Sequence, residues 1–318
     1  MRVLVTGAAG FIGSTLADRL LAGGDEVVGV DNFDPFYPES RKRSNLEAAL
    51  GHPRFRLVEL DIGDAEGVGA IVREVRPEAI AHLAARAGVR PSIESPDLYA
   101  STNLVGTTNL LEAARRLDPP PRFVYASSSS VYGEREDGPF RETDPVDRPI
   151  SPYAASKRAC ELMAHAFHHV HGLPATGLRF FTAYGPRNRP DLAIAKFARL
   201  IDSGEPVPMY GDGSTRRDYT YIDDIVDGIV RAIDRCEGYR IYNLGNSDPI
   251  ELRAMIEAIG EAMGVVPEIR RMPEQAGDVR ITCADITLAS AELGYTPRTP
   301  FREGIDRFVA WYRAASGR

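Results

Sequence analysis

Three side chains in the middle of the chain, Ser128, Tyr153 and Lys157, could together move a proton to and from an alcohol. Tyr153 and Lys157 are four residues apart, so they share one face of a helix. A lysine ammonium nearby favours the phenolate form of a tyrosine, which can then accept a proton at neutral pH. The hydroxyl of Ser128 can bind the oxygen that loses this proton. Many helices carry Tyr-x-x-x-Lys on a solvated face, so the surrounding elements decide whether the pair is functional.

The N-terminal segment predicts a unit that binds a dinucleotide. Residues 2–6 are short and apolar, as in a buried parallel strand, residues 14–22 are typical of a helix, and residues 26–30 of a second strand. The first glycine of the connecting turn allows a tight turn, the second lets backbone approach a pyrophosphate, and the third lets the helix pack closely on the strand. The helix start offers N–H groups and a positive dipole end to phosphates. The turn contains Gly7, Gly10, Phe11, Ile12 and Gly13.

The ends of the following strands supply further predicted cofactor contacts. Asp31 ends the second strand, where a carboxylate can accept hydrogen bonds from the adenosine ribose and repels a 2′-phosphate, which favours NAD over NADP. For Asp61 the alternative is that it only caps the next helix, over residues 65–75. The predicted contacts at strand ends are Asp31, Asn32, Asp61, Ile62, Leu83, Ala84 and Ala85.

Composition limits the class of protein. The 318 residues are 43% hydrophobic and 26% charged, enough for one large domain or two smaller ones. The net charge of −7, without a basic stripe, argues against a nucleic-acid partner. The chain opens directly on a strand and has no apolar run long enough to span a bilayer, so we expect a cytoplasmic protein with no membrane attachment. Three cysteines without pair spacing fit a reducing compartment and exclude a CxxC metal site: Cys160, Cys236 and Cys283.

Alternating strand and helix patterns predict an α/β fold with a Rossmann-type doubly wound parallel sheet and a smaller, mixed α/β C-terminal domain. We expect an NAD-binding domain over residues 1–175, with segments near 220–245 returning to it, and a second domain over residues 176–318. The expected strands are 2–6, 26–30, 55–60, 79–83, 123–126, 175–180 and 239–244.

Several local predictions concern the segments between these strands. We expect polar loops at 86–94 and 181–191, one long helix over 98–117, a turn at 211–217, and a helix over 225–235 that Asp223 caps. The helix that opens at Ser151-Pro152 carries four histidines without acidic or thiol ligands, which favours a solvated or partner-facing surface, and we predict no metal site. These histidines are His165, His168, His169 and His171.

These motifs resemble the extended short-chain dehydrogenase/reductases, specifically the nucleotide-sugar epimerases, over nearly the whole chain. The matching segments are Gly7-x-x-Gly10-x-x-Gly13, Leu83-Ala84-Ala85, the serine run before Val131-Tyr132-Gly133, Tyr153-x-x-x-Lys157, residues 211–224, and Gly277-Asp278-Val279-Arg280. The resemblance implies a bound, recycled NAD and a second domain that binds the nucleotide sugar. It also implies a homodimer through helix 98–117 and the Tyr153 helix, although their apolar positions equally suit packing on their own sheet.

The resemblance assigns roles to individual residues. Tyr153 is the base that takes the proton of the sugar 4-hydroxyl, Lys157 favours its phenolate and holds the nicotinamide ribose, and Ser128 binds the reacting hydroxyl. Arg217 and Arg280 correspond to arginines that bind the pyrophosphate, for which the guanidinium fork is suited. Tyr210 is a candidate stacking partner for uridine, a nucleoside that only the resemblance implies.

The reaction outcome follows from the residues before Val131. Related sugar 4,6-dehydratases have Asp-Glu there and UDP-glucuronate decarboxylases have Glu, whereas this chain has Ser129 and Ser130. A hydroxyl cannot replace a carboxylate as an acid or base at neutral pH, which leaves an epimerase that passes through a 4-keto sugar.

The sequence motifs distinguish the sugar of the substrate less sharply than they distinguish the type of reaction. The segment Phe180-Phe181-Thr182 and the surroundings of Arg90 and Arg189 resemble UDP-glucuronate 4-epimerases most, and either arginine could pair with the C6 carboxylate. A UDP-glucose/UDP-galactose 4-epimerase is the alternative. A non-catalytic NAD-sensing protein is a remote alternative, because such a protein could lose the catalytic pair, whereas Tyr153 and Lys157 are both present.

Overall fold

The computed structural model describes residues 1–135, 138–273 and 279–316. The strands are β1 (Arg2–Thr6), β2 (Glu26–Asp31), β3 (Phe55–Glu59), β4 (Ala79–His82), β5 (Arg122–Ser128), β6 (Ala175–Phe180), β7 (Thr182–Tyr184), β8 (Val207–Tyr210), β9 (Arg216–Tyr221), β10 (Tyr239–Leu244), β11 (Pro249–Glu251) and β12 (Ile269–Met272). The helices are α1 (Phe11–Ala22), α2 (Glu39–Asn45), α3 (Glu47–Leu50), α4 (Ala65–Val75), α5 (Val89–Glu94), α6 (Pro96–Tyr99), the π-helix η1 (Ala100–Val105), α7 (Gly106–Ala114), the 3₁₀-helix η2 (Ser129–Tyr132), α8 (Pro152–His171), α9 (Ala193–Asp202), α10 (Ile222–Asp234), α11 (Leu252–Met263), α12 (Thr287–Leu293) and α13 (Phe301–Ala315).

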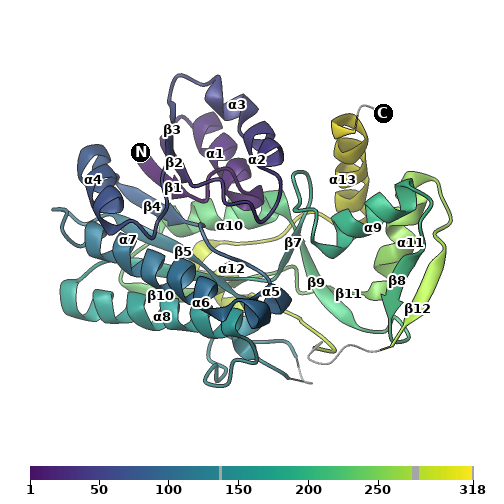
Figure 1. Cartoon of the computed structure of the whole chain (residues 1–318). Helices are drawn as coiled ribbons and strands as arrows, with labels where there is room; N and C mark the ends of the chain where they lie inside the picture. Colours follow the sequence, from purple (N-terminus) through teal and green to yellow (C-terminus); the bar gives the residue numbers. More distant parts are fainter. Residues whose placement is uncertain (136–137, 274–278, 317–318) are drawn as a thin grey trace.

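A seven-stranded parallel sheet forms the larger part of the molecule (Figure 1). Its order is β10-β6-β5-β4-β1-β2-β3, and every neighbouring pair is parallel. The strand order reverses at β1, which pairs with β2 on one side and with β4 on the other. Ligands of such sheets bind outside the carboxyl ends of the strands at this reversal. The predicted Rossmann-type doubly wound sheet is therefore confirmed.

Helices cover both faces of this sheet because its central strands are apolar on both sides. On one face, Leu4 of β1 shares a core with Ile71 of α4 and Leu110 of α7. On the other face, α1 and α10 pack together over the sheet, and Leu16 and Ile229 belong to a second core. The two layers hold β1 and β4 rigidly, and with them the turns that follow each strand.

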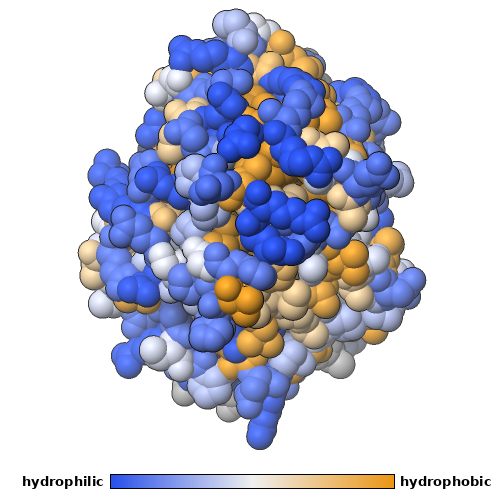
Figure 2. Space-filling model, turned by 90° about the vertical axis from the view of Figure 1, so that its left-hand side faces the viewer, coloured by the Kyte–Doolittle hydropathy of each residue, from blue (hydrophilic) through white to orange (hydrophobic). Residues whose placement is uncertain are grey.

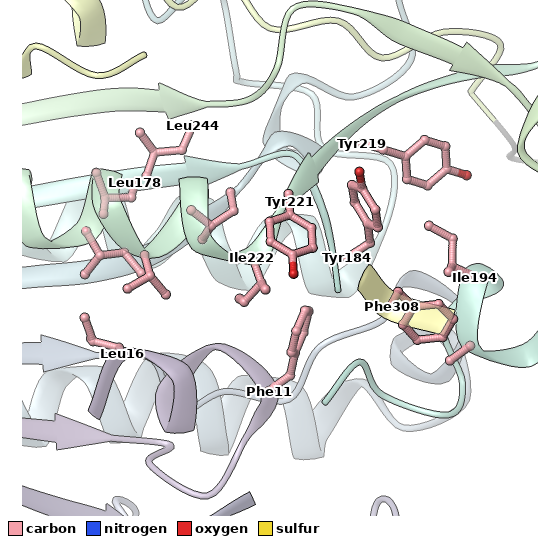
Figure 3. Close-up of a cluster of buried hydrophobic side chains, with 14 of the residues drawn as sticks. Phe11, Leu16, Leu178, Tyr184, Ile194, Tyr219, Tyr221, Ile222, Leu244 and Phe308 are labelled. Carbon is pink, nitrogen blue, oxygen red and sulfur yellow. The ribbon is translucent and has the colours of Figure 1, made fainter. Parts of the chain in front are cut away.

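The smaller part contains the sheets β11-β9-β7 and β12-β8 with α9, α11 and α13, on the right of Figure 1. Figure 3 shows that its aromatic side chains, among them Tyr219 and Phe308, share one apolar cluster with Phe11 and Leu16 of α1. The two parts thus have a common core. Strands β6 and β10 both lie in the large sheet, and the domain division at residue 175 stays a prediction.

The predicted helix over 98–117 is interrupted. Helix α6 ends at Tyr99, the π-helix η1 follows, and α7 begins at Gly106 and ends at Ala114. Asn103 lies in the π-helix and is almost fully buried, with three side-chain hydrogen bonds to Arg86 and Ser156. A π-turn often marks a functional position in a helix, and here it accommodates these tertiary hydrogen bonds.

Four more local predictions are wrong. The predicted loop 86–94 ends in helix α5, the loop 181–191 contains β7, and β9 begins inside the predicted turn 211–217. Asp223 does not cap α10, because that helix starts at Ile222 directly after β9 and its N-cap is Tyr221. Short strands such as β7 and β9 are set by pairing partners distant in sequence, and a local pattern does not contain that information.

The end of the molecule opposite the smaller part is largely polar. Figure 2 shows this face, where hydrophilic residues predominate and apolar residues gather in a band through the middle and in a group near the lower edge. In the part of the chain that the structure describes, no helix has the length and apolarity needed to cross a bilayer.

Candidate functional site

A cavity of about 560 Å³ lies at the carboxyl ends of β1, β4 and β5, and residues of β7 also line it. Most of the residues singled out from the sequence line it, although they come from segments far apart in the chain. They are Gly7, Gly10, Phe11, Ile12, Gly13, Asp31, Asn32, Asp61, Ile62, Leu83, Ala84, Ala85, Ser128, Ser129, Ser130, Tyr153, Lys157, Thr182 and Arg189.

The glycine turn is packed too tightly for any side chain. Gly7 has a φ of +71°, and a Cβ atom on it would lie 2.7 Å from the backbone nitrogen of Ala84. A Cβ atom on Gly13 would lie 2.0 Å from the carbonyl oxygen of Gly7. Close packing of β1, α1 and the end of β4 therefore requires glycine at both positions.

The N-terminus of α1 faces the cavity without a side-chain cap. Its N-cap is Gly10, which makes no side-chain hydrogen bond, and Phe11, Ile12 and Gly13 line the cavity. A helix start of this kind presents backbone N–H groups and a partial positive charge to an anion. Arg86 lines the same cavity, and its Nε atom is buried and has no acceptor among the described residues. These features fit the pyrophosphate of a dinucleotide.

The acidic residues at the ends of β2 and β3 are held by local hydrogen bonds. Asp31 accepts from the backbone N–H groups of Ala9 at 3.0 Å and Phe33 at 2.8 Å. Asp61 accepts from the side-chain amide of Asn32 at 2.8 Å. Asp61 does not cap α4, because Asp64 accepts from the first N–H groups of that helix. Both residues line the cavity, and their binding roles stay predictions.

Helix α8 carries Tyr153 in its first turn and Lys157 one turn later. Ser151 caps the helix by accepting from the N–H of Ala154 at 3.1 Å. The ring of Tyr153 packs edge-on against Tyr99, with 6.2 Å between the ring centroids. The buried Lys157 donates from Nζ to the carbonyl oxygen of Ala126 at 2.8 Å. The predicted pair thus shares the wall of one cavity with the glycine turn.

The serine run turns at the end of β5. Ser128 caps η2, its Oγ accepting from the N–H of Ser130 at 3.1 Å and donating to the Oγ of Ser130 at 3.2 Å. Three consecutive hydroxyls, of Ser128, Ser129 and Ser130, therefore line the cavity within one short helical turn.

A buried ion pair between Glu161 and Arg179 lies next to the serine run. Glu161 of α8 accepts from Ser127 Oγ at 2.6 Å and from Arg179 of β6 at 2.9 and 3.0 Å. Burial by itself raises the pKa of Glu161, but the hydrogen bond and charge of Arg179 reverse the shift, so that the pKa is lowered. The ion pair joins β6 to α8, the helix that carries Tyr153, and the hydrogen bond from Ser127 fixes the end of β5 to the same helix.

A second buried network lies under the turn after β4. His82 bonds through its two ring nitrogens to Thr6 Oγ1 at 2.7 Å and Thr107 Oγ1 at 2.9 Å. Burial, with a smaller contribution from the charge of Lys157, lowers the pKa of His82 to about 3. The neutral ring joins β1, β4 and α7 directly below Ala84 and Ala85.

The structure adds one group of cavity residues that sequence reasoning left unassigned. Arg86 and Asp34 form an ion pair of 2.6 Å between the loops after β4 and β2. The ring of Phe36 lies 6.0 Å from the guanidinium of Arg86 and 5.3 Å from that of Arg189. Arg86 comes directly after the predicted strand end Leu83-Ala84-Ala85. This position is the feature of the sequence from which Arg86 could have been assigned to the cavity.

Arg189 is already engaged by a protein carboxylate. It pairs with Asp191 through Nε at 3.0 Å and Nη2 at 2.7 Å, which leaves Nη1 outside the pair. Its side chain is 17% exposed. A second anion could therefore be bound only through the remaining part of this guanidinium.

Four predicted substrate residues do not line this cavity: Arg90, Tyr210, Arg217 and Arg280. Arg90 and Tyr210 approach each other from the two parts of the molecule, with 5.9 Å between guanidinium and ring. The backbone N–H of Arg216 donates to the carbonyl of Arg280, which places Arg217 and Arg280 on neighbouring segments. Gly277 and Asp278 of the same motif lie outside the described residues.

Comparisons with known proteins agree over almost the whole chain. The profile of the GDP-mannose 4,6-dehydratase family matches residues 4–308. The chain is 42% identical to UDP-glucuronate 4-epimerase 4 of Arabidopsis thaliana, over 98% of this chain and 75% of that protein. It superimposes with a TM-score of 0.93 on the UDP-glucuronic acid 4-epimerase of Bacillus cereus in complex with UDP-glucuronic acid and NAD, at 32% identity, over 99% of this chain and 100% of that one. With the UDP-glucose 4-epimerase of Thermotoga maritima the TM-score is 0.91 at 33% identity, over 99% and 100% of the two chains.

Proposed function

The chain belongs to the GDP-mannose 4,6-dehydratase family, and within it we propose an NAD-dependent UDP-sugar 4-epimerase that interconverts UDP-glucuronate and UDP-galacturonate. The observation that carries this proposal is that Tyr153 and Lys157 line the same cavity as the Gly7–Gly13 turn. A non-catalytic NAD sensor would not need this pair. The relatives named for UDP-glucuronate favour that substrate, and UDP-glucose/UDP-galactose is the alternative.

The predicted reaction has no net redox change. Tyr153 takes the proton of the sugar 4-hydroxyl, which Ser128 holds by a hydrogen bond, and a 4-keto sugar results. Lys157 supplies positive charge that stabilises the phenolate form of Tyr153, which is the form that accepts this proton. NAD, when bound, accepts the C4 hydride and returns it. After the keto sugar has turned over in the cavity, Tyr153 returns the proton to its oxygen.

The serine run explains why the reaction stops at epimerisation. A dehydratase or decarboxylase outcome requires an acid or base beside the keto sugar, and Ser129 and Ser130 line this part of the cavity instead. We therefore propose that the serine run does not catalyse dehydration or decarboxylation of the 4-keto sugar, which is then reduced from either face.

We propose that the C6 carboxylate is bound by Arg189, with Arg90 as the other candidate, beside Thr182. The 4-keto form of glucuronate is a β-keto acid, which loses CO₂ when the breaking bond aligns with the carbonyl π system. Holding the carboxylate near the carbonyl plane suppresses that loss. Arg189→Gln should raise the KM for UDP-glucuronate while leaving the KM for UDP-glucose nearly unchanged. An equal rise for both sugars would remove Arg189 from this role.

We also propose a homodimer. Leu98, Val105 and Leu162 are 36%, 50% and 55% exposed and lie on α6, η1 and α8, which pack against one another. Four such helices from two chains would cover these side chains. Light scattering during gel filtration should give twice the chain mass, and Leu162→Glu should give a monomer. A monomeric native protein would contradict this proposal.

A cytoplasmic location fits the three free cysteines, Cys160, Cys236 and Cys283. Fractionation of the source cells tests it, and recovery of the protein outside the cytoplasm would contradict it.

The assigned reaction is tested by incubating the purified protein separately with UDP-glucuronate and UDP-glucose and identifying the products by mass and NMR. The proposal predicts UDP-galacturonate, of unchanged mass, as the product of UDP-glucuronate. Much faster turnover of UDP-glucose would favour the alternative substrate. No turnover of either sugar, with NAD bound, would favour the sensor.

A further inference from the structure

The carboxylate of Asp218 lies where three segments of the smaller part meet. Asp218 is fully buried in β9. One of its oxygens accepts from the backbone N–H of Asn246 at 2.7 Å, and the other accepts from those of Ser247 at 3.0 Å and Ala284 at 2.9 Å. The loop after β10 and the segment before α12 are thereby both attached to β9.

The second of these segments carries Arg280. The N–H of Arg216 donates to the carbonyl of Arg280 at 2.9 Å, and the N–H of Thr282 donates to the carbonyl of Arg216 at 3.1 Å. The N–H of Asp218 itself donates to Thr282 Oγ1 at 3.2 Å. The segment 280–284 therefore runs beside β9 like an added strand, and the carboxylate of Asp218 closes its far end.

Arg217 immediately precedes Asp218, and side chains alternate along a strand. When the carboxylate of Asp218 points into the junction, the guanidinium of Arg217 leaves β9 on the opposite face. Fixing the position of Asp218 thus also fixes the direction of Arg217 and its separation from Arg280. Both arginines have long side chains, so the direction of each guanidinium toward a ligand depends on the position of the backbone that carries it.

We infer that Asp218 is a positioning residue for the diphosphate of the nucleotide sugar. Its carboxylate holds β9 and the segment 280–284 in the register that brings Arg217 and Arg280 to the same phosphates. This inference rests on the proposed function, because it takes the diphosphate as the ligand of these arginines.

The chemistry of the junction supports a carboxylate at this position. Burial raises the pKa of Asp218, while its backbone hydrogen bonds act in the opposite direction. A buried carboxylate is costly unless its oxygens are satisfied, and three N–H groups from two other segments satisfy this one. Neutral Asn has the same size, but its NH₂ group would face one of these N–H donors, so the junction would loosen without a change in volume.

The test is the variant Asp218→Asn in the full-length protein with its bound NAD. We expect the KM for the UDP-sugar and the Kd for UDP to rise about tenfold or more, while kcat at saturating sugar stays within about a factor of two and the NAD content stays that of the unmodified protein. UDP is the probe because it contains the diphosphate and lacks the reacting sugar.

The matched control is Asp224→Asn. Asp224 is likewise buried and accepts hydrogen bonds from two backbone N–H groups, those of Arg298 at 2.9 Å and Thr299 at 3.1 Å. It differs from Asp218 because it lies at the start of α10 and joins segments that carry no predicted phosphate ligands. This variant should lose stability and keep its Kd for UDP. A similar rise in the Kd for UDP in both variants would show general softening of the fold and overturn the inference.

The other outcomes are equally decisive. An unchanged Kd for UDP in Asp218→Asn overturns the inference and leaves the proposed function intact. Failure of the unmodified protein to bind UDP instead overturns the proposed nucleotide, and the inference with it. If Asp218→Asn does not fold, the variant Thr282→Val is tested in its place. This substitution removes the hydroxyl that accepts from the Asp218 N–H. A weaker binding of UDP by that variant at unchanged kcat supports the inference, and unchanged binding refutes it.

Discussion

Lys157 Nζ lies 2.8 Å from the carbonyl oxygen of Ala126, so the cation of α8 is attached directly to the end of β5. This hydrogen bond connects the two elements that carry the predicted chemistry, the helix with Tyr153 and the strand that leads to Ser128. The lysine side chain is nearly fully buried, and its orientation is therefore set by the fold rather than by solvent.

Replacing Lys157 by Met should lower kcat by about 10²-fold or more, because the positive charge that stabilises the phenolate form of Tyr153 is lost. The bound NAD should also dissociate more readily, because the resemblance assigns Lys157 to the nicotinamide ribose. Steady-state kinetics and the NAD content of the purified variant check both effects. Lys196→Met is the control, since Lys196 is exposed on α9 away from the cavity. Equal activity of the two variants would exclude a catalytic role for Lys157.

Replacing Tyr153 by Phe should lower kcat by about 10²- to 10⁴-fold, the usual contribution of a general base, while NAD remains bound. The control is Tyr99→Phe, which keeps the ring that packs on Tyr153 and removes the hydroxyl that donates to the carbonyl of Ala87 at 3.0 Å. That variant should keep most of its activity and lose some stability. An active Tyr153→Phe enzyme would require another base.

The ion pair between Arg86 and Asp34 should slow the release of NAD, because it joins two loops across the wall of the cavity. Arg86→Gln should release NAD up to about fivefold faster, since a partly exposed pair contributes up to about 1 kcal/mol. Dilution into excess unlabelled NAD, after loading with radiolabelled NAD, measures the rate. Arg56→Gln, which removes an exposed ion pair with Glu74, should leave the rate unchanged, and a rate equal to that of Arg86→Gln would contradict the prediction.

Stability should fall below neutral pH partly because of His82. Its pKa is lowered to about 3 in the folded protein, whereas an unfolded histidine has a pKa near 6.5. Between these values the unfolded chain binds a proton that the folded chain does not, so unfolding becomes easier as the pH falls, by about 1.4 kcal/mol between pH 7.5 and 5.5.

Urea unfolding at these two pH values measures that contribution. The variant His82→Gln should lose about 1.4 kcal/mol less stability over this interval than the unmodified protein. The exposed His169 supplies the control His169→Gln, which should lose as much as the unmodified protein. The same pH dependence in all three proteins would show that His82 titrates normally in the fold.

The parts of the fold that depend on local patterns could be predicted from the sequence. The buried apolar strands and the glycine turn depend on consecutive residues, and strand β1, predicted over residues 2–6, has those same bounds in the structure. The site residues at strand ends followed from the geometry of parallel sheets, as for Asp31 and Ala84.

Features created by contacts between distant segments could not be predicted in this way. Strand β9 exists because β7 and β11 pair with it. Its start at Arg216 falsified the predicted turn, and its end at Tyr221, directly before α10, falsified the cap at Asp223. The junction at Asp218 requires residues from three segments, and the pairing of Arg86 with Asp34 requires two loops that are 52 residues apart. For such residues the sequence shows only a charged side chain in a loop or a short strand.

The most direct test of the account uses UDP-glucuronate that carries deuterium at C4. If Tyr153 moves only the proton of the hydroxyl, while the hydrogen on C4 leaves and returns as a hydride within the closed cavity, the UDP-galacturonate formed should retain deuterium at C4 when the reaction runs in ordinary water. Loss of the label to solvent, seen by NMR as a proton at C4 of the product, would contradict the account.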